Sequence, residues 1–194
     1  MTHFSPALAL GVSLLAVALG GCGGAVPLTF DLAALPPSGR VSASARSVTV
    51  AEPVGIQPFE ADRIIVREPG GALSFLGGAQ WADRLPRLIQ TRLIQSLENS
   101  GRLKSVSRPG HKIVSDFQLI SEIRAFDIAA GSGEAVVDLS AKIIAEGTGK
   151  VVAARVFTAR IPVAKVDVAS AAVGLDAALA RVLGEMVVWV NSGR

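Results

Sequence analysis

The residue with the clearest chemistry is Cys22, the single cysteine in a chain of 194 residues. Its thiol is a nucleophile that can take up a covalent group, and two small residues, Gly20 and Gly21, directly precede it. An apolar run from Ala7 to Leu19 comes before them and contains no charged residue. A run of about 13 such residues is shorter than the roughly 20 that span a bilayer. It is typical of the hydrophobic region of a signal peptide.

The segment Leu19-Gly20-Gly21-Cys22 matches the bacterial lipobox at every position. In that motif a peptidase cuts before the cysteine after diacylglycerol is attached to its sulfur. The alternative is a small buried thiol in a core helix, but the glycines on both sides of Cys22 would break such a helix. We therefore expect residues 1–21 to be a signal peptide and Cys22 to carry a covalent lipid, with no other cofactor. Because Gly23 follows instead of Asp, the motif implies onward transfer to the outer membrane. Met1–Phe4 departs from the signal-peptide pattern because it has no Lys or Arg.

The charge balance argues against nucleic acid as a partner. The formal net charge is +3, and no cluster of Lys and Arg with interleaved aromatic residues is present. Removal of residues 1–21 leaves about 170 residues, which fits one domain with a real core. Because Tyr is absent and Ala, Val, Leu and Ile dominate, we expect that core to be aliphatic.

Residues 22–46 have the composition of a tether that follows the lipidated cysteine. Pro27, Pro36 and Pro37 punctuate the segment, and small residues dominate its second half. Such a composition predicts an extended, mobile connection between lipid and fold. Within it, residues 28–32 alternate between apolar and polar, which allows a short edge strand. The folded domain is then expected to cover residues 47–194.

Two groups of strands are expected. Three short ones cover residues 47–53, 62–67 and 72–76, and Gly77-Gly78 is expected to end the third. The consecutive β-branched centre of the second predicts cover on both faces. Three longer segments with period-two patterns, 113–128, 135–146 and 151–163, are joined by Gly-rich turns and predict an antiparallel meander.

Two helices are predicted. One covers residues 82–99, with Asp83 as its N-cap, Pro86 in its first turn and Gly101 as its stop. The other covers residues 167–190, with Asp167 as its N-cap. Its polar positions form only a narrow stripe, so most of its surface requires burial under other elements or against a partner subunit. The residues of this stripe are Ser170, Gly174, Arg181 and Glu185. The predicted fold class is α/β, a single mixed-sheet domain with a long antiparallel meander and two main helices packed on the sheet.

The order of these motifs resembles the ABC-type transport auxiliary lipoproteins, the outer-membrane partners of systems built on mammalian-cell-entry (MCE) domain proteins. After the lipobox, the resemblance rests on Phe30-Asp31-Leu32, Asp62–Arg67, Trp81-Ala82-Asp83 and an Ala-rich helix near Trp189. Phe30 stands where Tyr is usual. The resemblance implies a mixed α/β domain on the periplasmic face of the outer membrane, anchored by lipid. It also implies a role in moving lipids or hydrophobic compounds together with an MCE-domain protein of an ABC system.

An enzyme is not expected, and no catalytic or metal-binding residue is assigned. His111 is the one histidine outside the signal peptide, and it sits in a Pro-Gly turn without a partner for acid–base chemistry. No Cys/His cluster has metal-ligand spacing, and no P-loop is present. Trp81 has two interpretations. It packs under the sheet at the start of a helix, or it forms a candidate docking surface with Arg63 and Arg67.

Three functions from different classes follow. The first is the auxiliary lipoprotein of an MCE-type transport system. The second is a structural envelope lipoprotein that assists assembly of an outer-membrane or cell-wall machine, because the same tether and domain would serve that role. The third is direct binding of lipid in a pocket of the aliphatic core. A homo-oligomer is compatible with each of them.

Overall fold

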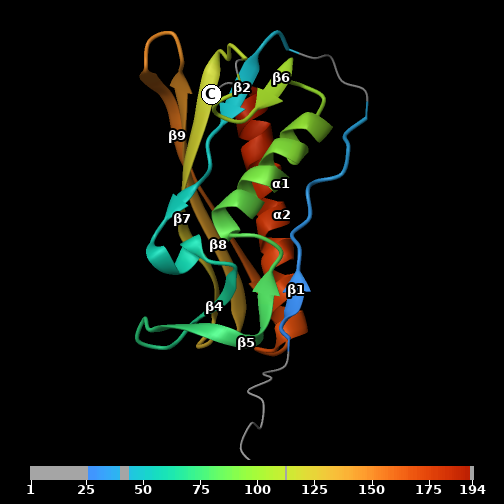
Figure 1. Cartoon of the computed structure of the whole chain (residues 1–194), viewed down its shortest axis with the longest axis vertical. Helices are drawn as coiled ribbons and strands as arrows, with labels where there is room; N and C mark the ends of the chain where they lie inside the picture. Colours follow the sequence, from blue (N-terminus) through green and yellow to red (C-terminus); the bar gives the residue numbers. More distant parts are fainter. Residues whose placement is uncertain (1–25, 40–43, 112, 193–194) are drawn as a thin grey trace, which may run out of the picture.

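The computed structural model describes residues 26–39, 44–111 and 113–192. Within them the chain forms a nine-stranded sheet and two α-helices (Figure 1). The strands are β1 Leu28–Phe30, β2 Ser47–Val50, β3 Val54–Gly55, β4 Arg63–Arg67, β5 Leu73–Trp81, β6 Ser105–Ser107, β7 Phe117–Ala129, β8 Glu134–Ala145 and β9 Lys150–Pro162. The helices are α1 Leu85–Asn99 and α2 Val168–Ser192, with a short 3-10 helix, η1, at Gln57–Glu60.

Strand β7 is the centre of the sheet. One of its edges pairs with β8 in antiparallel fashion, and β8 pairs in the same way with β9. These strands are the predicted meander, which is therefore confirmed, although β7 begins at Phe117, later than predicted. The other edge of β7 pairs in succession with β2, β3 and β4, all of them parallel to it. The sheet is extended beyond β2 by β6, and beyond β4 by β5 and then β1.

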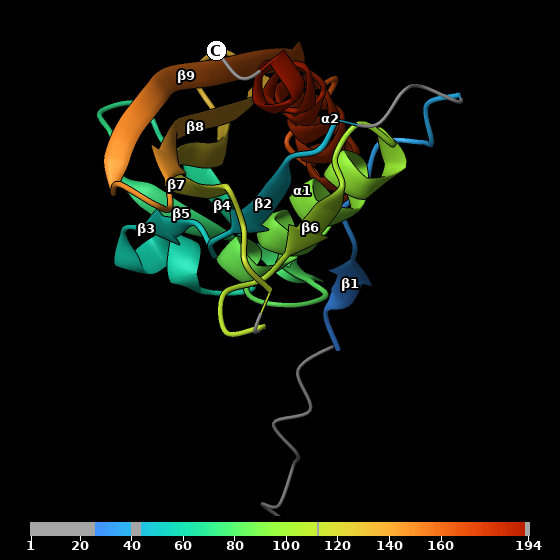
Figure 2. The same cartoon turned by 90° about the horizontal axis from the view of Figure 1, so that it is seen from above.

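Both helices lie on the same side of the curved sheet (Figure 2). Helix α2 packs against β8 and β9, and α1 packs against α2. At one end of this layer the rings of Phe157 and Trp189 meet edge to face, with centroids 5.4 Å apart. The core between the layers is mainly aliphatic, as predicted. A single domain with a mixed sheet and two packed helices confirms the predicted fold class.

Helix α1 begins at Leu85, three residues later than predicted. Asp83 is not its N-cap, so that prediction was wrong. The N-cap position belongs to Arg84, whose side chain makes no capping hydrogen bond. Asp83 instead accepts a hydrogen bond from the backbone N–H of Arg84 at 2.8 Å and pairs with Arg87 at 3.3 Å. The helix ends before Gly101, which has a φ of +64° that favours glycine.

Helix α2 begins after Asp167, and this predicted N-cap is confirmed. The carboxylate of Asp167 accepts a hydrogen bond from the backbone N–H of Ser170 at 2.8 Å. That hydrogen bond favours the charged form and lowers the pKa of Asp167 below its ordinary value. The cap thus satisfies one of the donors that every helix leaves free at its start.

Gly174 marks the closest approach of α2 to the sheet. It was predicted to lie on the polar stripe, but it is buried. A Cβ at this position would lie 2.5 Å from Cγ1 of Val163 and 3.1 Å from Cβ of Ala135. The prediction was wrong because the missing side chain of glycine serves packing here and not helix polarity.

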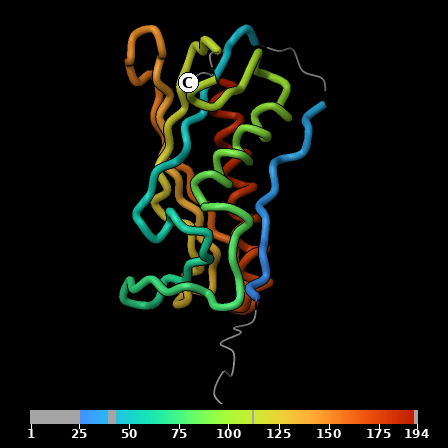
Figure 3. The backbone as a smooth tube through the Cα atoms, viewed as in Figure 1, coloured from blue at the N-terminus to red at the C-terminus, as the bar shows by residue number. Residues whose placement is uncertain are grey.

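Strand β5 continues through Gly77-Gly78, where it was predicted to end. Gly78 has a φ of +76°, which L side chains rarely adopt. The strand follows one end of the molecule and then turns upward beside β1 (Figures 1 and 3). As a result Trp81 is the last residue of a strand. The sequence pattern had placed it at the start of the helix.

Candidate functional site

The predicted lipidation site lies outside the described residues. Cys22 and the cleavage motif Leu19, Gly20 and Gly21 therefore stay predictions. The first described residue, Val26, is four positions after Cys22 and two positions before the start of β1.

Residues 26–39 are held against the domain, which corrects the prediction that the whole of 22–46 is a mobile tether. Strand β1 pairs with β5, and Leu32 is 2% exposed. Beyond β1 the backbone N–H of Leu35 donates to the Ser96 hydroxyl at 3.0 Å, and that of Ser38 donates to a carbonyl at the end of α1 at 2.9 Å. These partners are about sixty residues away in the sequence, so local composition gave no sign of them. The predicted domain boundary at residue 47 therefore falls inside the packed unit.

Three of the sequence motifs that carried the family resemblance meet at one place, the β1–β4–β5 junction (residues 30–32, 61–63 and 79–85). The carbonyl of Phe30 accepts a hydrogen bond from the N–H of Ala82 at 2.7 Å. On the other side, the N–H of Trp81 donates to the carbonyl of Asp62 at 2.6 Å. The backbone thus joins the start of the domain, β4 and the entry to α1. Trp189, the fourth motif position, lies elsewhere, against Phe157.

The candidate docking residues Arg63, Arg67 and Trp81 do not form one surface. Trp81 is 1% exposed, and its ring meets Phe126 edge to face with centroids 5.9 Å apart. A docking role for Trp81 is therefore wrong, and burial in the core is the interpretation that the structure supports. Arg63 is exposed, and its guanidinium carbon lies 5.1 Å from the centre of the Phe75 ring. It remains available for a partner.

Arg67 is engaged in an ion pair with a buried carboxylate. Its Nη2 lies 2.6 Å from Oδ2 of Asp127, and its Nε lies 3.1 Å from both carboxylate oxygens. The Asp127 side chain is 2% exposed, so its charge is compensated mainly by this guanidinium. The Arg67 side chain is 36% exposed, so the cost of breaking the pair falls mainly on the buried carboxylate, which is left uncompensated when the cation is removed. Arg67 is therefore first a structural residue that ties β4 to β7.

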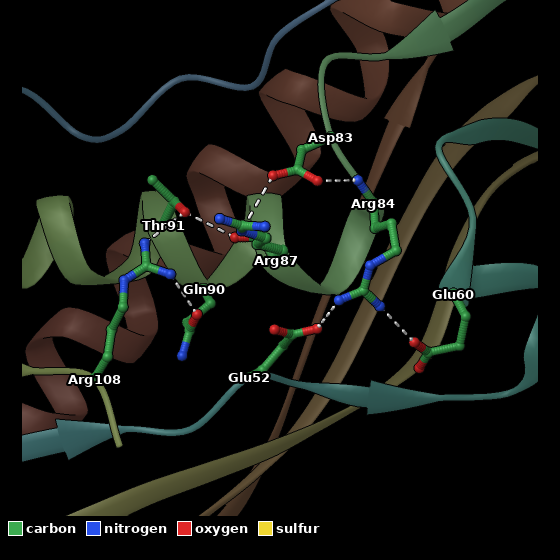
Figure 4. Close-up of polar contacts among 8 residues, drawn as sticks. All are labelled: Glu52, Glu60, Asp83, Arg84, Arg87, Gln90, Thr91 and Arg108. Carbon is green, nitrogen blue, oxygen red and sulfur yellow. Dashed lines mark hydrogen bonds and ion pairs between the residues drawn. The ribbon is translucent and has the colours of Figure 1, made fainter. Parts of the chain in front are cut away.

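A polar network beside the start of α1 is a feature that the sequence did not reveal (Figure 4). Arg84 reaches Glu52 at 2.8 Å and Glu60 at 3.2 Å. All three side chains are about half exposed, so each pair contributes under about 1 kcal/mol. The partners lie 24 and 32 residues from Arg84, and no local pattern links them.

The same network continues along α1 through Arg108. Its guanidinium donates to the Gln90 side-chain oxygen at 2.7 Å and to the Thr91 hydroxyl at 2.8 Å (Figure 4). Gln90 is buried and donates in turn to the carbonyl of Val50 at 2.9 Å. The network therefore fixes the loop after β6 and the end of β2 to the helix. It holds elements in place and contains no nucleophile next to a base.

The two best-defined hollows among the described residues offer no enclosed space of lipid size. The cavity beside Val48, Phe117 and Val190 has a volume of about 10 Å³. Pockets for small ligands usually measure roughly 300–1,000 Å³. A larger groove of about 710 Å³ lies open to solvent and is lined partly by charged side chains, including Arg108, Asp116 and Glu146. The interior is thus packed, and the groove is not an apolar slot for an acyl chain.

The described part of the chain contains no group of three or more His, Cys, Asp or Glu side chains placed to hold a metal ion. His111 lies exposed in the turn predicted for it. None of the helices that the structure describes is long and apolar enough to cross a membrane.

The fold defines a class of protein, a small α/β domain in which the segment of residues 26–39 pairs with β5 and packs along α1. More specifically, the chain belongs to the family of ABC-type transport auxiliary lipoprotein components, whose family model matches residues 23–187. The suspected family is thereby confirmed. A family of transport components is non-enzymatic in kind and consists of lipoproteins of ABC transport systems.

The chain is also similar to individual proteins. The crystal structure of protein XCC0632 from Xanthomonas campestris has a TM-score of 0.78 and 28% identity, over 86% of this chain and 95% of that one. A second crystal structure, of an uncharacterized protein, has a TM-score of 0.66 over 85% of this chain and 99% of that one; at 13% identity it shows the fold alone. The protein bll6063 from Bradyrhizobium diazoefficiens is 33% identical over 177 residues. The match covers 88% of this chain but 46% of that protein, so this chain spans about half the length of its curated relative.

Proposed function

We propose that this chain is an outer-membrane lipoprotein, anchored through lipid on Cys22 and facing the periplasm. In this role it is the auxiliary component of an MCE-type ABC transport system that moves lipids or hydrophobic compounds across the envelope. The observation that carries the proposal is the family match over residues 23–187. The motif Leu19-Gly20-Gly21-Cys22 supplies the anchor immediately before the matched region.

The physical arrangement supports an adaptor that binds its partners and catalyses no reaction. The interior of the described domain is packed, so the transported compound does not require a pocket in this chain. Two or three acyl chains, at about 0.8 kcal/mol per buried CH₂, hold a protein stably on a membrane, whereas one chain holds it marginally. The covalent lipid on Cys22 is then the one non-protein group that the role requires. The partner is the periplasmic MCE-domain protein of the system.

Fractionation of cells tests the anchor. Cys22→Ala should displace the folded domain from the outer-membrane fraction, because no sulfur remains for the glyceride. Gly24→Ala is the matched control, since it lies outside the Leu19–Cys22 motif and should leave the chain in place. An outer-membrane Cys22→Ala protein with full function would contradict the anchor.

Affinity purification tests the partner. The tagged, lipidated chain, extracted from membranes, should co-purify with an MCE-domain protein identified by mass spectrometry. Recovery of proteins of outer-membrane or cell-wall assembly in its place would contradict the transport role and favour the structural envelope lipoprotein. Recovery of the MCE partner with the Gly24→Ala control would show that the assay itself is intact.

A further inference from the structure

The end of the molecule where the described chain begins also carries an exposed hairpin whose second strand, β5, contains no charged residue. Strand β1 starts there, and the β4–β5 hairpin (residues 63–81) runs along the same end (Figures 1 and 3). From Pro69 to Ala82 the sequence contains no charged residue. The hairpin tip is exposed, and so is Phe75, which exposes 49% of its surface. An exposed stretch without charge can lie against an apolar surface without the cost of burying a charged group.

The distance to the predicted lipid is short. Val26 lies four positions after Cys22, and an extended chain covers at most about 3.5 Å per position, so the two lie within about 14 Å. Val26 is 89% exposed, and Leu28, in the outermost strand of the sheet, is 63% exposed. A lipid on Cys22 therefore keeps this end of the molecule close to the headgroups.

We infer that the β4–β5 hairpin rests on the bilayer that holds the Cys22 lipid, with Phe75 at the boundary between headgroups and acyl chains. This inference rests on the lipid attachment in the proposed function. Arg63 lies over the Phe75 ring at 5.1 Å, so its guanidinium is held beside the side chain that enters the interface. An aromatic ring below the headgroups with a cation among the phosphates is the arrangement that amphipathic interfacial segments use.

The backbone limits how deeply the hairpin enters. Strand β1 pairs with β5 only from Ala79 to Trp81, so the outer edge of Leu73–Gly77 keeps unpaired N–H and C=O groups among the described residues. Such groups cost several kcal/mol each in hydrocarbon but remain hydrated among headgroups. The hairpin therefore lies at the interface and does not span the membrane.

The opposite end of the molecule does not fit a lipid surface in this way. The β8–β9 turn lies there (Figure 1) and carries Glu146 and Lys150 on either side of its glycines. Val151, just after the turn, is 56% exposed and thus resembles Phe75 in exposure. It offers a matched control at the far end of the same sheet.

The test measures how deeply single side-chain positions of the full, lipidated chain enter the membrane. Phe75→Cys and Val151→Cys each introduce the one reactive thiol, because the sulfur of Cys22 is blocked as a thioether. A nitrobenzoxadiazole label on each is then exposed to vesicles of phosphatidylethanolamine and phosphatidylglycerol that contain spin-labelled lipid. We expect quenching at position 75 to be several-fold stronger than at position 151. Amide exchange of the unlabelled protein should slow at residues 68–78 in vesicles and stay unchanged at the β8–β9 turn.

The outcomes separate the two proposals. If the labelled protein floats with the vesicles but quenching at position 75 equals that at position 151, the hairpin contact is overturned and the lipid anchor stands. If the full chain without the fluorescent label does not float with the vesicles, the lipid anchor is contradicted. The hairpin inference is then contradicted as well, because it rests on that anchor. Strong quenching at 75 together with slowed exchange of the hairpin supports both.

Discussion

The two halves of β5 place similar residues in opposite environments. In Leu73–Gly77, Phe75 stands half exposed under an arginine. In Ala79–Trp81, the indole of Trp81 is buried against Phe126. The second half has strands on both of its edges, whereas the first has β4 alone. Burial of an aromatic side chain in this strand therefore follows from what covers its ring, Phe126 in the core for Trp81 and an exposed guanidinium for Phe75, and not from residue type.

The sharpest test of this contrast replaces each aromatic residue by alanine. Trp81→Ala should lower the free energy of unfolding by about 3–5 kcal/mol, since it removes a fully buried side chain and leaves a cavity. Phe75→Ala should change it by under about 1 kcal/mol, because half of the ring already contacts solvent. Urea unfolding followed by circular dichroism measures both. Equal losses would show that the first half of β5 is as tightly packed as the second.

The two arginines of β4 extend the contrast to charge. Arg67→Met should cost about 3 kcal/mol, because it leaves the buried Asp127 carboxylate without its cation. Arg63→Met removes an exposed cation–π contact and should cost under about 1 kcal/mol. Unfolding at neutral pH measures both variants. If Arg67→Met were as mild as Arg63→Met, water would have to reach Asp127, and the tie between β4 and β7 would be weak.

The smallest effects are expected at the bend between the two halves. Gly78 has a φ of +76°, so Gly78→Ala should lower the free energy of unfolding by about 1 kcal/mol despite open space around a Cβ. Gly77 has neither a positive φ nor a close neighbour. Gly77→Ala should therefore raise the stability slightly, by about 0.4–1 kcal/mol, through the unfolded state. Opposite signs for adjacent glycines in thermal unfolding would locate the bend at residue 78, and equal signs would contradict it.

The periodic segments of the sequence predicted most of the fold. The meander of β7, β8 and β9 and both helices followed from spacing, because the apolar residues of each recur with the period of its secondary structure. Strand β9 was found in this way although it buries only Phe157 and Ala159. The path of β5 did not follow, since glycine is compatible with both a break and a bend. The packing of residues 26–39 was also missed, because the N–H groups of Leu35 and Ser38 find their acceptors on α1 and not nearby in the sequence.

The candidate functional residues were also predictable only where their pattern is local in the sequence. Cys22 could be predicted as the lipidation site because its motif is local, and it stays a prediction. The docking role of Trp81 was misjudged because the sequence shows a tryptophan beside a helix but not the Phe126 ring opposite it. The network around Arg84 could not be inferred, because its carboxylate partners come from the loop after β2 and from η1. Side chains that act through distant partners leave no periodic pattern.

The packed segment of residues 26–39 also determines how the domain responds to mechanical force. Tension applied at Val26 acts along the axis of β1, so it loads the bonds between β1 and β5 together in shear and does not peel them apart one at a time. The bonds from Leu35 and Ser38 to α1 hold the same segment further along. A pull from the membrane would reach the helix and the sheet edge as a single rigid load, and a partner bound to this domain would be moved with it.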